Sequence, residues 1–60
     1  MTSKEVRKLL KDNGCYLKRQ GKGDHEIWFS PITGKTFPVP HPKRQIPVGT
    51  LKSIKRLAGI

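Results

Sequence analysis

The 60-residue sequence predicts an α+β fold of the order α-β-β-β-α, in which two helices pack on one face of a three-stranded antiparallel sheet. Three observations predict this fold. Apolar residues recur at helical spacing near both ends of the chain, runs of strand-forming residues lie between them, and glycine-containing turns separate these runs. Because so short a chain allows one domain only, we expect residues 1–60 to form a single domain with a thin core and an open, shallow site.

The first helix is expected from Ser3 to Asn13. Thr2 and Glu5 have capping-box spacing, so each side chain can bond a free amide of the first turn. Gly14 suits the left-handed residue that ends a helix, and Cys15 the apolar residue of a Schellman motif. The apolar stripe consists of Val6, Leu9 and Leu10.

Three strands are expected in the middle of the chain, at Cys15–Gln20, His25–Ser30 and Thr36–Pro40. The turn Gly21–Asp24 joins the first two strands, because its two glycines permit positive φ. These short runs predict a meander with the second strand in the middle.

The third strand contains prolines two residues apart, at positions 38 and 40. Amides two residues apart in a strand point to the same side, so both missing N–H groups face one edge. Proline is tolerated only at sheet edges, which predicts an edge strand. It also protects that edge against unwanted strand addition.

The second strand has two candidate buried faces. Ile27 and Phe29 share one face with His25, whereas Trp28 shares the other face with Glu26. Two large apolar side chains against one predict that the face of Ile27 and Phe29 is buried, with His25 at its rim.

Three aromatic side chains have two possible roles, namely Trp28, Phe29 and Phe37. On a surface, aromatic rings stack on nucleobases. In so small a domain we expect these rings in the core instead.

The second helix is expected from Pro47 to Ala58, with Gly59 ending it. Pro47 suits the first helical position, although Thr50 is an alternative cap. Its apolar face consists of Leu51, Ile54, Leu57 and Ala58.

The charge balance points to a polyanionic partner. There are 13 Lys and Arg but only 4 Asp and Glu, which gives a net charge of +9, and no acid follows Glu26. Such a field favours RNA, DNA, an anionic membrane or an acidic protein. The expected phosphate contacts are Lys18, Arg19, Lys22, Lys43, Arg44, Lys52, Lys55 and Arg56.

Several classes are disfavoured by composition. One Cys and two His are too few for a closed structural zinc site, and four acids are few for a metal-dependent nuclease, so we expect neither metal nor cofactor. No apolar run approaches the roughly 18 residues of a membrane span, and no hydrophobic signal segment is present. With its lone cysteine, Cys15, the chain is expected to act in the cytoplasm without a membrane partner.

The order of elements resembles the double-stranded-RNA-binding fold, and the details resemble the HicA toxins of prokaryotic toxin–antitoxin pairs. The resemblance covers essentially the whole chain. It is carried by Leu9–Gly14, Gly23–His25, Val39–Pro42, Ile46–Ile54 and Leu57–Ile60.

This resemblance implies an endoribonuclease that cleaves mRNA without the ribosome and is blocked by a HicB-type antitoxin. It implies a monomer when alone and a hetero-oligomer with the antitoxin. The family's catalytic histidine corresponds to His25. Asp24 stands where the family usually has Ser, and Cys15 where it has an aromatic residue.

The residues themselves are compatible with this chemistry. RNA carries its own nucleophile, the 2′-hydroxyl, so a minimal ribonuclease needs a base, cations around the phosphate and a proton donor. Histidine suits the base because it titrates near neutrality. The donor stays open between Lys22, His41 and water, and His25 could instead be a polar residue with no chemistry.

Two other functions fit the same charge and element order. One is a non-catalytic double-stranded-RNA-binding module, and the other is a DNA-binding or ribosome-associated basic protein. The double-stranded-RNA-binding module usually begins its second helix with a lysine cluster, whereas this helix begins Pro47-Val48-Gly49-Thr50.

Overall fold

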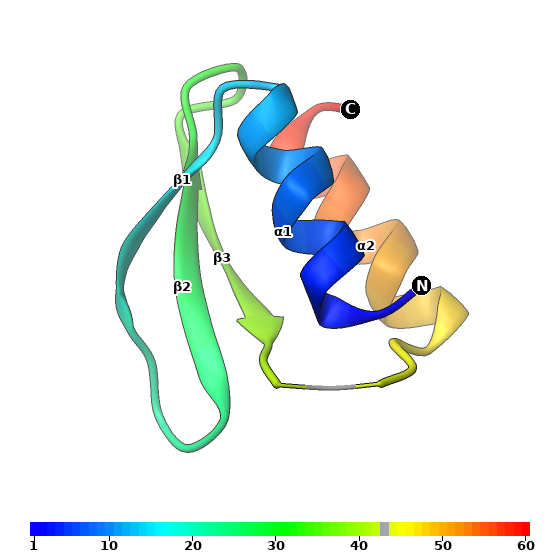
Figure 1. Ribbon diagram of the computed structural model, residues 1–60. Coiled ribbons are helices and arrows are strands. Elements are labelled where there is room, and N and C mark those ends of the chain that lie inside the picture. The colour runs from blue at the N-terminus through cyan, green and yellow to red at the C-terminus, as the bar shows by residue number, and fades with distance from the viewer. Residues whose placement is uncertain (43) are drawn as a thin grey trace.

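The computed structural model describes residues 1–42 and 44–60. Its elements are α1 (Ser3–Asp12), β1 (Tyr16–Gln20), β2 (His25–Ser30), β3 (Lys35–Pro40) and α2 (Val48–Ala58). The strands form one antiparallel sheet in the order β1-β2-β3, and both helices cover the same face of it (Figure 1). The predicted fold class is confirmed.

The beginning of α1 is fixed by the predicted capping box. The hydroxyl of Thr2 accepts the backbone N–H of Glu5 at 3.2 Å, and the Thr2 N–H donates to Oε1 of Glu5 at 2.8 Å. Two amides that would otherwise lack helical partners are thereby satisfied.

Both helices end at a glycine in the left-handed region. Gly14 has φ 85° and Gly59 has φ 80°. After α1, the N–H of Cys15 reaches back to the carbonyl of Leu10 at 2.9 Å, which is the long bond of a Schellman motif. Cys15 and Leu10 are both buried, so the motif also directs the chain into β1.

The buried face of β2 is opposite to the predicted one. Glu26, Trp28 and Ser30 are buried, whereas Ile27 and Phe29 are only half-buried on the face away from the helices. The expectation that Ile27 and Phe29 form the core face is therefore wrong, and so is the assignment of Phe29 to the core.

The reason is that the polar residues of this face find partners. Nε of Arg7 lies 3.3 Å from Oε1 of Glu26, and Nε1 of Trp28 donates to the same oxygen at 3.2 Å. The contact between Arg7 and Glu26 is an ion pair only, because the Nε–H of Arg7 is not aligned for a hydrogen bond. Trp28 also pairs with Phe37 across the strands, and Glu26 with Val39, which places four side chains on one buried surface.

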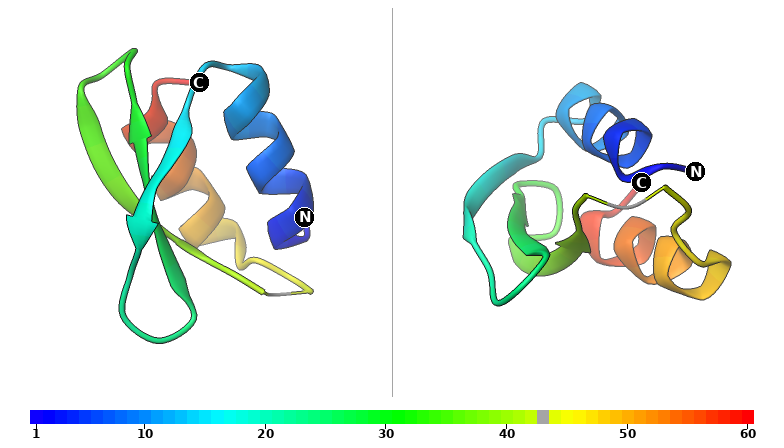
Figure 2. Two further views of the ribbon diagram at one scale, coloured as in Figure 1. Left: turned by 60° about the vertical axis from the view of Figure 1, so that its left-hand side comes forward. Right: turned by 60° about the horizontal axis from the view of Figure 1, so that its bottom comes forward.

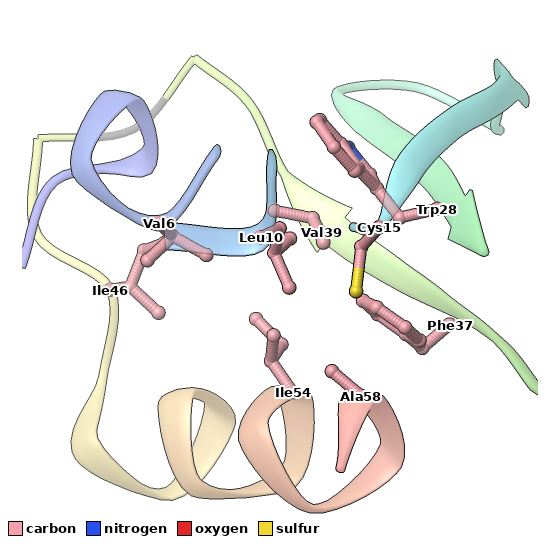
Figure 3. Packing of buried hydrophobic residues seen from close by; sticks show 9 residues of the cluster. All are labelled: Val6, Leu10, Cys15, Trp28, Phe37, Val39, Ile46, Ile54 and Ala58. Atoms are coloured by element: carbon pink, nitrogen blue, oxygen red, sulfur yellow. The ribbon is translucent and has the colours of Figure 1, made fainter. Parts of the chain in front are cut away.

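The core lies between the two helices and this face of the sheet (Figure 3). It consists of Val6, Leu10, Cys15, Trp28, Phe37, Val39, Ile46, Ile54 and Ala58. Leu51 and Leu57 of the expected stripe of α2 are partly buried against it. The core is small, so most functional groups remain at the surface.

The remaining strand predictions were partly right. β3 is an edge strand, as the prolines at 38 and 40 predicted. The register of β1 with β2 shifts between Leu17 and Arg19, so Lys18 is an extra residue that the sequence did not indicate. Because of this bulge, Arg19 lies opposite Ile27 and so on the open face of the sheet.

The turn between β2 and β3 fastens the C-terminal end of α2. The hydroxyls of Ser30 and Thr33 donate to the carbonyls of Ala58 and Leu57, both at 2.6 Å. A Cβ at Gly59 would lie 2.9 Å from Thr33, so the approach requires glycine there. At this end of the molecule, the turn and the end of α2 are therefore held in close contact.

No helix within the described part of the chain is long and apolar enough to cross a lipid bilayer.

Replacing Arg7 with Met should destabilise the fold by about 3 kcal/mol, because the Glu26 carboxylate would stay buried without its cation. The value lies at the low end for buried pairs, since the Arg7 side chain is 30% exposed. Urea unfolding measures it. The double variant Arg7→Met with Glu26→Gln should recover part of the loss, and a single variant as stable as the parent would contradict this account.

Replacing Glu5 with Gln should give a stability difference that depends on pH. The hydrogen bond from the Thr2 backbone lowers the pKa of the Glu5 carboxyl below 4.5. A lowered folded-state pKa contributes stability that is present above the ordinary value and lost as pH falls through the folded value. Urea midpoints should therefore differ at pH 7 and converge at strongly acidic pH, and a gap independent of pH would refute the assignment.

Candidate functional site

A groove of about 430 Å³ opens at the end of the molecule opposite the turn between β2 and β3. It is lined by Asp24, His25, Pro40, Pro42, Pro47 and Thr50. Figures 1 and 2 show that both helices begin at this end, which is also the end of the turn that joins β1 to β2. Residues from the turn, from the end of β3 and from the start of α2 are thus brought together.

The backbone of His25 is held firmly although its side chain is exposed. Its carbonyl accepts the Gly21 N–H at 2.8 Å and the Gln20 side-chain amide at 3.0 Å, and its own N–H donates to Lys22 at 3.3 Å. His25 is therefore an exposed imidazole on a fixed support.

Gly21 has a different role from the predicted one. Of the two turn glycines, only Gly23 has positive φ, at 62°. A Cβ at Gly21 would lie 2.8 Å from the carbonyl oxygen of His25, so the glycine is needed for close approach rather than for its dihedral angles.

The segment after β3 is tied to the same place by His41. Its backbone N–H donates to the carbonyl of Asp24 at 2.7 Å, directly before His25. Its ring contacts Ser3 Oγ through Nδ1 at 3.0 Å and an Arg7 nitrogen through Nε2 at 3.4 Å. Arginine only donates, so Nε2 is the acceptor where this contact is a hydrogen bond. His41 thereby connects α1 to the groove.

The start of α2 lies at the groove, which Pro47 and Thr50 line, and its first amides have no helical acceptors. The first helical bond runs from the Leu51 N–H to the Pro47 carbonyl at 2.9 Å. The amides of Val48, Gly49 and Thr50 precede it and have no helical acceptor, and Pro47 offers no capping side chain. Pro47 is thus the N-cap, so neither predicted alternative, Pro47 as first helical residue or Thr50 as cap, is correct.

This arrangement suits an anionic ligand. A helix N-terminus combines free N–H groups with a partial positive charge, and the first turn of α2 contains no acid to neutralise it. The hydroxyl of Thr50 lines the same groove as His25. Sequence reasoning considered Thr50 only as a cap, because nothing in the spacing shows that residues 25 and 50 meet.

The predicted phosphate contacts are spread over the molecule. Arg44 lines a second depression beside the groove, and Lys22 lies in the turn before His25. Arg19 shares the open face of the sheet, with Lys18 at the bulge beside it.

The other predicted contacts lie on or before α2. Lys52 lies on α2, exposed, about one turn from its start. Lys55 and Arg56 lie in the last turn of α2, away from the groove. Lys43 lies outside the described residues.

Within residues 1–42 and 44–60, no group of three or more His, Cys, Asp or Glu is arranged to hold a metal ion.

Comparison with known proteins gives one match. Over residues 3–60 the chain matches a family model described as the HicA toxin of bacterial toxin–antitoxin systems. No curated protein and no solved structure matches it significantly.

Replacing His25 with Ala should leave the fold intact. The side chain is exposed and only its backbone is used structurally, so the free energy of unfolding should change by less than about 0.5 kcal/mol. Urea unfolding of the variant beside the parent measures this. A loss of more than about 1 kcal/mol would show that the ring is a structural group.

Proposed function

Since the chain belongs to the HicA toxin family, and is thus a toxin of a toxin–antitoxin system, we propose that it is an endoribonuclease that cleaves mRNA with His25 as its catalytic residue. The observation that carries the proposal is the position of His25. An exposed imidazole on a fixed backbone shares a groove with the uncapped start of a helix.

The proposed reaction uses the substrate's own nucleophile. His25 removes the proton of a ribose 2′-hydroxyl, and the oxygen attacks the adjacent phosphorus. The bond from phosphorus to the 5′-oxygen of the next nucleotide breaks, and that oxygen takes up a proton. The products are a 2′,3′-cyclic phosphate and a 5′-hydroxyl, so no water or metal is consumed in the step.

The start of α2 supplies the electrostatic part of the mechanism. Negative charge builds on the phosphate as the 2′-oxygen attacks, and donors aimed at that charge lower the barrier. The free amides of Val48 to Thr50 and the Thr50 hydroxyl are such donors. Lys22, in the turn before His25, adds a cation.

Two of the three candidate proton donors remain after the structure is considered. Both ring nitrogens of His41 are engaged by Ser3 and Arg7, which disfavours His41 as the donor. We therefore favour Lys22 or water as the donor to the leaving oxygen.

The remaining cations would hold the RNA away from the cleaved bond. Arg44 lines the depression beside the groove, Lys52 is exposed on α2, and Arg19 lies on the open sheet face with Lys18 at the bulge beside it. Lys55, Arg56 and Lys43 stay predicted phosphate contacts. Such contacts make affinity fall as salt rises, with little dependence on sequence.

We also propose that a HicB-type antitoxin inhibits the toxin by covering the His25 groove, in the cytoplasm where mRNA is found. An inhibitor that occupies this groove needs to block only one exposed ring and the start of one helix, which suits a small open site.

The purified protein should cleave single-stranded RNA in the presence of EDTA and leave 2′,3′-cyclic phosphate ends. His25→Ala should lower kcat/KM by about 10²–10⁴-fold, as expected for loss of a general base. Thr50→Val should lower it about tenfold, as for one hydrogen bond to a charged group. Gel analysis of end-labelled RNA with product-end mapping measures both.

A matched control is Lys35→Ala, at the opposite end of β2 and β3, which should cleave like the parent. Free 3′-hydroxyl ends would rule out the mechanism. Equal RNA binding without cleavage by the parent and His25→Ala would favour the non-catalytic double-stranded-RNA-binding module.

A further inference from the structure

A second depression adjoins the His25 groove. It measures about 400 Å³ and is lined by Thr2, Ser3, Lys4, His41, Pro42 and Arg44. Pro42 lines both the groove and the depression, so the two are contiguous. Among the described residues, the predicted phosphate contact Arg44 and the candidate proton donor His41 belong to it.

We propose that this depression is the subsite for a nucleotide next to the cleaved bond, with the base on its apolar floor and a phosphate between Lys4 and Arg44. The inference rests on the proposed function, since it names where the flanking part of the same RNA is held. It adds Lys4, from the first turn of α1, to the residues that bind substrate.

The surface chemistry of the depression matches a nucleotide. Its lining is predominantly apolar, yet the cations of Lys4 and Arg44 flank it. A base stacks on flat or apolar surface while its phosphate needs a cation, and arginine binds phosphate in a bidentate manner. An acidic protein segment would use the cations but would leave the apolar floor without a partner.

The floor offers stacking rather than base readout. The ring nitrogens of His41 already contact Ser3 and Arg7, and the Thr2 hydroxyl is used in the cap of α1. Pro42 has no backbone donor. The subsite should therefore accept any base.

The spacing between groove and subsite is fixed by backbone bonds. His41 is tied to Asp24 at 2.7 Å, and the Ile46 N–H donates to the Met1 carbonyl at 2.9 Å. A strand that places its reactive phosphate at His25 therefore meets the subsite at one defined distance along the chain. Occupying the subsite would hold the reactive phosphate in register.

Binding of a single-stranded 2′-O-methyl RNA pentamer tests the subsite without cleavage, because the probe lacks the 2′-hydroxyl. Fluorescence anisotropy should show Lys4→Ala and Arg44→Ala each binding about tenfold more weakly, with the slope of log K against log salt reduced by about 0.7. Lys35→Ala is the matched control and should bind like the parent. An abasic nucleotide at one position should weaken parent binding about tenfold.

If Lys4→Ala and Arg44→Ala bind the RNA probe as tightly as the Lys35→Ala control, the subsite is refuted. So would an unchanged RNA affinity together with weaker binding of an acidic protein partner. If parent and His25→Ala cleave RNA equally while Lys4→Ala and Arg44→Ala still bind more weakly, the catalytic assignment fails and the subsite stands. If cleavage depends on His25 while Lys4→Ala and Arg44→Ala bind RNA like the parent, the subsite fails and the catalytic assignment stands.

Discussion

The contact between Arg7 and Glu26 decides how the rest of the molecule is arranged. It allows a carboxylate to lie in the core face of β2, beside Trp28, and so selects which side of the central strand meets the helices. With Glu26 and Trp28 turned inward, alternation along the strand turns the face of His25, Ile27 and Phe29 outward. An ion pair of this kind adds little net stability compared with apolar packing. Its effect here is on orientation.

Stability and the proposed chemistry are concentrated at opposite ends of the fold. At one end, Ser30 and Thr33 satisfy the last carbonyls of α2, and Gly59 allows close packing. At the other end, the first amides of α2 have no helical acceptors, beside His25. A helix has orphan groups at both termini, and only those at its start carry positive character. The end left uncapped is therefore the end at which we propose that phosphate binds.

So small a core is compatible with catalysis because RNA cleavage demands little of the protein. The nucleophile belongs to the substrate, and no cofactor has to be enclosed. What is needed is one imidazole held in place and a set of donors that does not move during the reaction. In the proposed mechanism, the bonds to both sides of the His25 backbone meet the first requirement, and the start of α2 meets the second.

The sequence by itself determined the element order, the capping box, the glycine that ends each helix and the edge position of β3, because each depends on neighbouring residues or on the absence of an amide. It also singled out His25, through a resemblance that the family match supports. The tertiary structure alone decided the buried face of β2, since counting apolar residues cannot reveal that Arg7 neutralises Glu26 from another element. It alone brought Thr50 and Pro42 into the groove of His25 and Lys4 into the adjoining depression, because contacts between residues far apart in the chain depend on how the elements pack and not on their spacing.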